Sequence, residues 1–288
     1  GYGIPIYTNW TLPFKKDQPR VMSEPPTHYY SYINRNPVGQ YVTSFKVQGP
    51  MKDKTYYLHF GGVESAMYVW VNGHRVGYSE NSMSPAEFNI TPYIQEGDNK
   101  LAVEVYSYSD GSYIEDQDMW RLSGIFRSVD LWTRPNVHIA DYVITAIPDE
   151  DFSTAVAKFN FQLANLSNKN RKNLELKVDV SGKDKKGKEV SYTAVKNIAK
   201  IVSGDKACAD VELILDNPSL WSSEKPNLYH VDITLSSNGK CLEHFTNHLG
   251  VRKVEIRGEV IYYNGKPIKI KGVNRHEFHP RTGRTMDR

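Results

Sequence analysis

The stretch Ala66-Met-Tyr-Val-Trp-Val71, Asn72-Gly73, His74-Arg-Val-Gly-Tyr78 decides the fold of the first part of the chain. Aromatic and β-branched residues are typical of strands, and an Asn-Gly pair favours the tight turn that joins two antiparallel strands. The same alternation of period two recurs at Tyr56–Phe60, Lys100–Tyr106 and Ile125–Trp132. Short aromatic strands separated by Gly, Pro and Asn predict an antiparallel β-sandwich.

A boundary is predicted near Thr133-Arg-Pro-Asn-Val137, where aromatic residues become rarer and Lys and Asn more frequent. Seven further strands are expected beyond it, at Tyr142–Ile147, Ala155–Ala164, Leu174–Ser181, Glu189–Val195, Ala209–Leu215, Tyr229–Ser236 and Cys241–Leu249. Seven short strands in about 100 residues are typical of an immunoglobulin-like sandwich. The Cys…Trp…Cys spacing of antibody domains is absent, so a generic sandwich is predicted.

The end of the chain follows another pattern. Val260–Pro267 is a second Asn-Gly hairpin, and it leads into an expected strand over Ile268–Pro280 that carries Asn274, Arg275, His276, Glu277 and His279. Catalytic groups of α/β barrels lie where strands end, and such a barrel takes roughly 250 residues. Only the first strand of a barrel would fit in the residues that remain.

Composition excludes several classes of function. The net charge is +3, from 36 bases and 33 acids without a long block of either sign, so nucleic-acid binding is not expected. No run approaches the roughly 20 apolar residues that cross a bilayer, so no membrane partner is expected either. Cys208 and Cys241 make no disulfide framework and are expected to be two half-buried thiols in strands. They leave the compartment open, since a periplasmic protein can also be poor in cysteine.

The segment Asp110–Arg127 is the most informative about function. Asp110, Glu115, Asp116 and Asp118 fall within nine residues, flanked by four aromatic residues: Tyr106, Tyr108, Tyr113 and Trp120. Sugar rings present C–H faces to aromatic side chains, and sugar hydroxyls donate to carboxylates. The segment therefore predicts a sugar site.

Three roles are open for these acids. Asp116 and Asp118 are two residues apart, roughly 7 Å in extended backbone, which fits the pair of an inverting glycosidase. Both would lie on one loop and on the same side of a sugar, so hydroxyl or cation binding by one or two acids is favoured. A hydrogen-bonded structural loop is the alternative for Glu115 and Asp116. The spacing of His276 and His279 does not match a zinc helix. A histidine that donates to a sugar hydroxyl, or one that supports such a group from behind, is favoured instead.

A family resemblance is carried by segments that follow one another in order: Tyr7-Thr-Asn9, Gly62–Ala66, Val71-Asn-Gly73, Asp110–Arg127, Asn217–Trp221, Lys225–Tyr229 and Gly272–Glu277. Together they resemble glycoside hydrolase family 2, and within it the large lac-type bacterial β-galactosidases. The resemblance implies an all-β chain in three parts. Residues 1–134 would be the jelly-roll sugar-binding domain, residues 135–253 the immunoglobulin-like β-sandwich, and residues 254–288 the incomplete start of the (β/α)8 catalytic barrel.

The same resemblance assigns roles to individual residues. It implies that Asp118 binds a sodium ion and the galactose, that Asn9 and His276 bind the sugar, and that Asp110 lies near a secondary magnesium site. Two departures from the family pattern, Trp10 and Glu64, leave the exact specificity open. The acid/base and nucleophile Glu of the family would lie beyond residue 288, so no catalytic residue is assigned within the chain.

The function implied is that of the N-terminal part of a β-galactosidase, which hydrolyses terminal β-D-galactosides with retention. Magnesium and sodium would be bound by the full-length enzyme, which is expected to be a homo-oligomer, and the 288-residue chain alone is expected to be inactive. One alternative is a stand-alone carbohydrate-binding module, which would have no use for Gly272–His279. Another is a family 2 hydrolase for a β-glucuronide or β-mannoside, against which the likeness at Asp118 argues.

Overall fold

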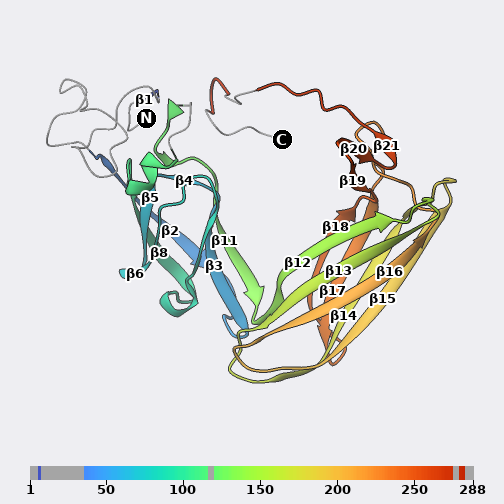
Figure 1. The fold of residues 1–288 in the computed structure, drawn as a ribbon. Coiled ribbons are helices and arrows are strands. Elements are labelled where there is room, and N and C mark those ends of the chain that lie inside the picture. The colour runs from blue at the N-terminus through green and yellow to red at the C-terminus, as the bar shows by residue number, and fades with distance from the viewer. Residues whose placement is uncertain (1–5, 8–35, 116–119, 275–278, 283–288) are drawn as a thin grey trace. The chain divides into compact units, whose positions relative to one another are not determined.

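A computed structural model describes residues 6–7, 36–115, 120–274 and 279–282 of the chain (Figure 1). The elements in these ranges are strands, apart from two 3₁₀ turns, η1 (Thr91–Tyr93) and η2 (Asp110–Tyr113). No helix in the described ranges is long and apolar enough to cross a membrane. The chain divides into two compact units, one of Gly1–Thr133 with Val273–Arg288 and one of Arg134–Gly272.

The first unit is an antiparallel β-sandwich. One sheet has the order β2 (Val38–Val47), β8 (Gly97–Tyr106), β5 (Ala66–Val71) and β6 (His74–Ser79), and the other has the order β11 (Val129–Pro135), β3 (Lys54–Phe60) and β7 (Ala86–Asn89). Residues of both sheets form one buried cluster, which includes Phe60, Met67, Val69, Val71, Leu101 and Val103. The alternation in the sequence therefore places one face of each strand in a shared core.

The predicted hairpin of this sandwich is confirmed. Asn72 and Gly73 have φ angles of 50° and 82°, the left-handed values that a two-residue hairpin turn needs. The Asn72 side chain donates to the Tyr93 carbonyl at 2.9 Å and accepts from the Lys100 backbone N–H at 2.9 Å. Asn72 thus forms the turn and also ties it to β8 and η1.

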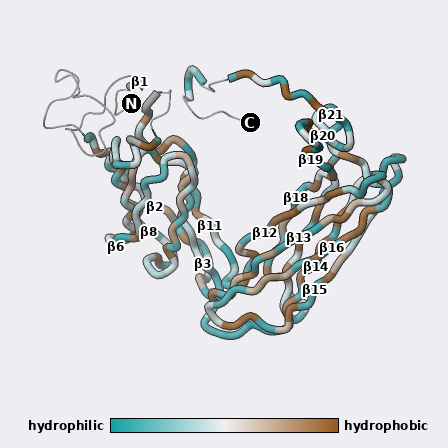
Figure 2. The backbone as a smooth tube through the Cα atoms, viewed as in Figure 1, coloured by the Kyte–Doolittle hydropathy of each residue, from teal (hydrophilic) through white to brown (hydrophobic). Residues whose placement is uncertain are grey.

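The second unit holds the predicted immunoglobulin-like sandwich. One sheet has the order β12 (Val137–Pro148), β13 (Thr154–Asn165) and β16 (Lys206–Asp216). The other has the order β15 (Glu189–Ile201), β14 (Arg171–Lys183), β17 (Tyr229–Ser237) and β18 (Lys240–Leu249). Hydrophobic and hydrophilic residues alternate along these strands in Figure 2. The inward residues are almost fully buried, among them Phe159, Leu163, Leu176, Ile233 and Leu235. An Asn-Gly turn that was not predicted, at Asn238-Gly239, joins β17 to β18.

The expectation of half-buried cysteines is wrong. Cys208 and Cys241 lie in strands β16 and β18 as predicted, yet both are exposed. In β16 every second residue from Ala209 to Leu215 is buried, so Cys208 lies on the outward face of the strand. The exposure of a strand residue depends on which face of the strand it lies on, and the presence of a cysteine does not indicate that face.

A small antiparallel sheet follows the sandwich, formed by β19 (Val254–Arg257), β20 (Val260–Tyr263) and β21 (Lys266–Pro267). The predicted turn at Asn264-Gly265 is confirmed, with φ angles of 46° and 74°. Asn264 donates to the Trp221 carbonyl at 3.0 Å and accepts from the Lys253 backbone N–H at 2.9 Å. The turn is therefore anchored to the same unit as the sandwich.

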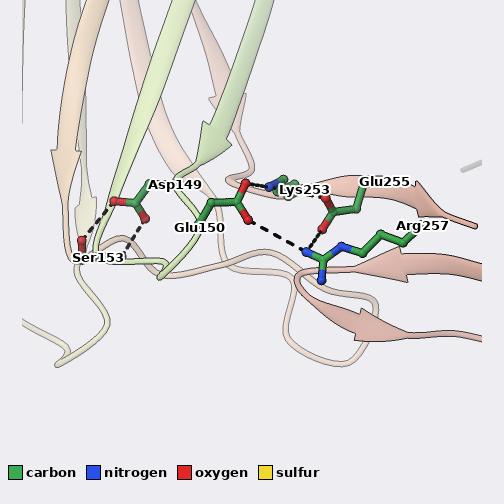
Figure 3. A network of polar contacts seen from close by, with 6 residues as sticks. All are labelled: Asp149, Glu150, Ser153, Lys253, Glu255 and Arg257. Atoms are coloured by element: carbon green, nitrogen blue, oxygen red, sulfur yellow. Dashed lines mark hydrogen bonds and ion pairs between the residues drawn. The ribbon is translucent and has the colours of Figure 1, made fainter.

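Ion pairs make a second connection between this small sheet and the sandwich (Figure 3). Glu150, in the loop after β12, pairs with Lys253 at 2.5 Å and with Arg257 of β19 at 4.0 Å. Glu255 pairs with the same two residues, at 3.5 and 2.5 Å. The Lys253 side chain is only 16% exposed, so solvent screens its pairs less than those of a free surface lysine. Residues 254–272 belong to the second unit, although a domain boundary was predicted after residue 253; the three-part division stays a prediction.

The predicted strand over Ile268–Pro280 is not formed in its described part. The Ile268 N–H donates to the Ile261 carbonyl of β20 at 2.9 Å. Residues 269–274 pair with no strand in the described ranges, and Ile270 and Val273 are 77% and 89% exposed. A strand of a parallel barrel is stabilised by neighbours on both sides. No such neighbour is among the described residues, which is the physical reason for the difference.

Candidate functional site

The acidic segment begins at the end of β8, where Tyr108 is 5% exposed. The Asn36 side-chain amide donates to the Tyr108 carbonyl at 2.9 Å and accepts from the Tyr108 N–H at 3.0 Å. Both backbone groups of Tyr108 are therefore held by one side chain. This fixes the direction in which the chain leaves the sheet.

Three serine hydroxyls hold the next turn, η2. The hydroxyl of Ser65, which is 2% exposed, lies 2.7 Å from that of Ser109 and 3.0 Å from that of Ser112. The Ser109 N–H also donates to the Ser112 hydroxyl at 3.0 Å, which satisfies a backbone group at the start of the turn. The turn that carries Asp110 is thus fastened to the residue just before β5.

The acids of this segment differ in their surroundings. Both carboxylate oxygens of Glu115 accept hydrogen bonds from Ser82, one from the hydroxyl at 2.6 Å and one from the N–H at 3.3 Å. This confirms the structural interpretation of Glu115. Asp110 is exposed, and within the part of the chain that the structure describes its carboxylate accepts from the N–H of the adjacent Gly111, at 3.1 Å. Asp110 therefore keeps lone pairs for a ligand.

The charge of Asp110 acts on Tyr78, a tyrosine of β6. Burial and a 2.7 Å hydrogen bond from the Tyr78 hydroxyl to Glu80 raise the pKa of Tyr78, and the negative charge of Asp110 raises it further. The hydroxyl thus stays protonated and acts as a donor. Glu80 and Asp110 make this margin of the sheet negative, which suits a cation or a sugar hydroxyl.

The far end of the segment is held by backbone pairing. In β1 (Ile6–Tyr7) and β9 (Trp120–Arg121), Tyr7 pairs with Trp120, and in β4 (Val63–Glu64) and β10 (Gly124–Ile125), Glu64 pairs with Gly124. Gly124 has a φ of 119°, which favours glycine there. The segment is therefore fastened at both ends.

Glycine is also required beside β10. A Cβ atom on Gly62 would lie 2.6 Å from the Phe126 ring, which leaves no room for a side chain. Arg127 donates to the carbonyls of Gly61 and Met83, at 3.0 and 3.1 Å. The predicted strand Ile125–Trp132 is interrupted at residues 126–128. Its first residue belongs to β10 and its end to β11, and these two strands lie in different sheets.

The main predicted substrate residues, Asn9, Asp118 and His276, lie outside the described residues, as do Asp116 and Glu277. Their roles stay predictions. His279 is described, and its ring Nδ1 accepts from the N–H groups of Arg281 and Thr282, both at 3.2 Å. That contact makes it a structural residue of a turn.

The described residues contain no group of three or more His, Cys, Asp or Glu side chains placed to hold a metal ion. Magnesium binds through one or two carboxylates together with water. Asp110, as an exposed carboxylate, fits magnesium only as a single oxygen donor. The sodium ligand proposed at Asp118 falls outside the described ranges.

Sequence reasoning missed the residues that support the site. Asn36, Ser65 and Ser82 lie 72, 44 and 33 residues from their partners along the chain. Isolated serines and asparagines form no pattern, so no local signal could have revealed them. The glycines at 62 and 124 were visible in the sequence, and only their neighbours explain them.

Three models of one family match consecutive parts of the chain. "Glycosyl hydrolases family 2, sugar binding domain" matches residues 1–135, "Glycosyl hydrolases family 2" matches residues 137–252, and "Glycosyl hydrolases family 2, TIM barrel domain" matches residues 254–288. Together they account for nearly the whole chain, in the order in which the resemblance placed them.

Curated relatives agree with these models. The chain is similar to a beta-galactosidase of Priestia megaterium, at 39% identity over 99% of this chain, and to one of Halalkalibacterium halodurans, at 40% over 99%. A beta-galactosidase of Clostridium acetobutylicum is 43% identical over 87% of this chain. The chain spans only about a quarter of these relatives, 26–27% of their length.

Solved structures agree in fold. Bacteroides uniformis beta-glucuronidase 2, covalently bound to cyclophellitol-6-carboxylate aziridine, matches with a TM-score of 0.75 at 25% identity, over 86% of this chain and 30% of that one. Parabacteroides merdae beta-glucuronidase matches with a TM-score of 0.72 at 20% identity, over 87% of this chain and 32% of that one. The second likeness shows the fold alone.

Proposed function

Because this chain belongs to glycoside hydrolase family 2, we propose that it forms the front part of a β-galactosidase that hydrolyses terminal β-D-galactosides with retention. One observation carries the proposal. Beta-galactosidases from three bacteria are 39–43% identical to this chain over 87–99% of its length. In this proposal the chain supplies substrate contacts and the scaffold that holds them, and a catalytic barrel supplies the reacting carboxylates.

Asn9, Asp118 and His276 are the residues proposed to bind the galactose. The pairing of Tyr7 with Trp120 supports a joint role for two of them, because Asn9 follows Tyr7 by two residues and Asp118 precedes Trp120 by two. The contacts at Asn36, Ser65, Ser82 and Gly61 support it further, since they fasten the acidic segment on both sides of Asp118. A substrate contact held by a rigid frame loses less entropy on binding.

The reaction proposed is the retaining one. A pair of glutamates on the barrel would act, one as nucleophile and one as acid and then base, through a covalent glycosyl-enzyme. The part of this chain is to bind and orient the sugar. Without that glutamate pair, the 288 residues alone are expected to show no turnover.

Metal ions have a supporting role in this proposal. Asp118 would hold sodium beside the sugar, and Asp110 would give one oxygen to magnesium, consistent with its exposed carboxylate. Magnesium, when bound, would supply a positive charge that tunes the acid/base glutamate. The full-length enzyme is proposed to be a homo-oligomer.

A second candidate keeps the family and changes the sugar. The likeness to one solved beta-glucuronidase, at 25% identity, favours a β-glucuronide as that alternative. The curated relatives at 39–43% identity are beta-galactosidases, so the galactoside is preferred. The stand-alone binding module is disfavoured by the match of residues 254–288 to a barrel domain.

The test is made on the full-length gene product. Hydrolysis of the nitrophenyl β-D-galactoside, β-D-glucuronide and β-D-mannoside is compared, and proton NMR of the first-formed sugar gives the anomer. We expect the galactoside to be preferred and the β-anomer to form first. Preference for the glucuronide would contradict the galactosidase proposal and support the β-glucuronide alternative. A first-formed α-anomer would exclude retention.

Residue roles need a separate measurement. Asp118→Asn should lower kcat/KM by roughly tenfold or more, about 1.4 kcal/mol or more, and should weaken the response to sodium. Glu115→Gln is the matched control, because Glu115 is bound by Ser82 within the protein. Equal effects of the two substitutions would count against a direct role for Asp118.

A further inference from the structure

Four aromatic side chains gather on the outward face of the sheet β2-β8-β5-β6: Tyr68 and Trp70 of β5, Tyr78 of β6 and Tyr106 of β8. We call this group the aromatic platform. In β5 the alternate residues Met67, Val69 and Val71 fill the core, so Tyr68 and Trp70 point to the opposite face. We propose that this platform binds a β-linked oligosaccharide.

Tyr68 is the centre of the platform. Its ring centroid lies 4.7 Å from that of Tyr78, 6.0 Å from that of Trp70 and 5.9 Å from that of Tyr106. The register places Tyr68 opposite Tyr78 on one side and Glu104 on the other. The rings therefore cover three neighbouring strands as a continuous surface.

The platform is partly open to solvent, and Tyr68, Trp70 and Tyr106 are each half-buried. Tyr78 is 42% exposed, and Val42 of the adjacent edge strand β2 is 66% exposed on the same face, opposite Ala102. Folding does not explain this exposure, since aromatic rings stabilise a sandwich most when they lie in its core. Large exposed apolar patches with polar margins mark binding sites.

The polar groups at the margin select the class of ligand. Glu104 lies in the same face, accepts from the Gln40 amide at 3.3 Å and lies 3.4 Å from the Tyr106 hydroxyl. The Arg75 guanidinium lies over one face of the Tyr68 ring, 4.6 Å from its centre. Donors and acceptors thus border flat rings, and this combination matches a pyranose, with hydroxyls at its rim and C–H groups on its faces.

A protein partner fits this surface less well. Glu104, Gln40 and Arg75 are polar groups within or beside the platform, and the exposed aliphatic residues on its face are Val38 and Val42 of one edge strand. The centre of a protein interface is depleted of charged residues. We therefore commit to carbohydrate and treat self-association as an outcome of the test.

The platform goes beyond the proposed catalytic function. A surface that holds one part of a polymeric carbohydrate raises the local concentration of its other ends near the same molecule. It does not require that the galactosidase proposal be correct, because the platform belongs to the sandwich of the first unit. The two can therefore fail separately.

The 288-residue chain is titrated with β-1,4-galactotetraose and with cellotetraose by isothermal titration calorimetry. We expect binding of at least one of them at millimolar concentration or below. Tyr68→Ser and Tyr106→Ser should each weaken it roughly tenfold, about 1.4 kcal/mol. Tyr41→Ser is the control, since Tyr41 is a tyrosine of β2, 40% exposed, whose neighbours in sequence, Gln40 and Val42, face the platform.

Circular dichroism and the unfolding midpoint establish that each variant is folded. If Tyr68→Ser does not fold, the binding measurement is made with Tyr106→Ser, whose residue lies at the margin of the platform. Loss of binding in the platform variants with retention in Tyr41→Ser supports the proposal. The absence of binding by the unaltered chain overturns it, as does equal binding by the platform variants. Concentration-dependent dimerisation that the same two substitutions abolish would also overturn it, because the platform would then be a self-association surface.

Discussion

Removal of one hydroxyl, by Ser82→Ala, tests whether Glu115 is a structural acid. The Ser82 hydroxyl donates to the Glu115 carboxylate at 2.6 Å, and Ser82 is 2% exposed. A hydrogen bond to a charged group contributes about 1.5–3 kcal/mol. Because the Ser82 N–H, 3.3 Å from the other oxygen, remains, we expect a loss of about 2 kcal/mol of unfolding free energy.

Urea unfolding followed by tryptophan fluorescence measures this loss, since four of the five tryptophans lie within residues 1–133. A loss of about 2 kcal/mol lowers the midpoint by about 1 M when the slope is about 2 kcal/mol per molar. Ser84→Ala, at an exposed serine of the same loop, is the control and should leave the midpoint unchanged.

A double-mutant cycle with Glu115→Gln isolates the pair. The double variant should lose less than the sum of the two single losses, by about 0.5 kcal/mol or more. If the losses simply add, or if Ser82→Ala changes the free energy by less than about 0.5 kcal/mol, the structural role of Glu115 is refuted.

Three further outcomes are expected. Gly62→Ala should cost about 1–3 kcal/mol of unfolding free energy, because its Cβ would lie 2.6 Å from the Phe126 ring. Gly272→Ala is the control, since Gly272 has no left-handed φ and a Cβ there would meet nothing within 4 Å. The side-chain hydrogen bond from Thr154 lowers the pKa of Asp149 to about 2, so stability from this group is present above the unfolded pKa and is lost as the pH falls from about 4 to about 2. Asp149→Asn should therefore flatten thermal unfolding midpoints over that range. Asn264→Ala should lower the unfolding midpoint seen by the one tryptophan of the second unit, because it removes two hydrogen bonds of about 1 kcal/mol each.

Each of these has a result that contradicts it. A Gly62→Ala protein as stable as the unaltered chain would mean that the Phe126 ring moves freely. If the thermal unfolding midpoints of Asp149→Asn and the unaltered protein fell in parallel as the pH is lowered, Asp149 would not contribute to the loss of stability in acid. An unchanged midpoint in Asn264→Ala would mean that the turn is not fastened to the sandwich.

Strands with one buried face were predictable from the sequence. Ala66–Val71 was predicted to the residue, and Leu174–Ser181 lies wholly within β14, because alternation records which face meets a core. β2 was missed: its residues are exposed on both faces along most of their length, so no alternation marks them. Ile268–Pro280 was predicted as a strand and its described part does not form one, because alternating apolar residues form a strand only beside a partner strand.

The site was less predictable than the fold. Asp110–Arg127 was recognisable by its acids and aromatics, yet the contacts that hold it come from Asn36, Ser65 and Ser82, each more than 30 residues away. Such contacts depend on how sheets bring distant segments together. Residue type and spacing do not encode them locally.

The three Asn-Gly turns bear on the order in which the molecule folds. The turns at Asn72, Asn238 and Asn264 join strands that are adjacent in sequence, namely β5–β6, β17–β18 and β20–β21. Closing so short a loop costs little entropy, whereas the β13–β16 ladder joins residues such as Asn160 and Asp210, 50 positions apart. Local hairpins are therefore expected early and the long-range ladders late, so substitutions in β16 should change the rate of folding less than substitutions in the Asn-Gly turns.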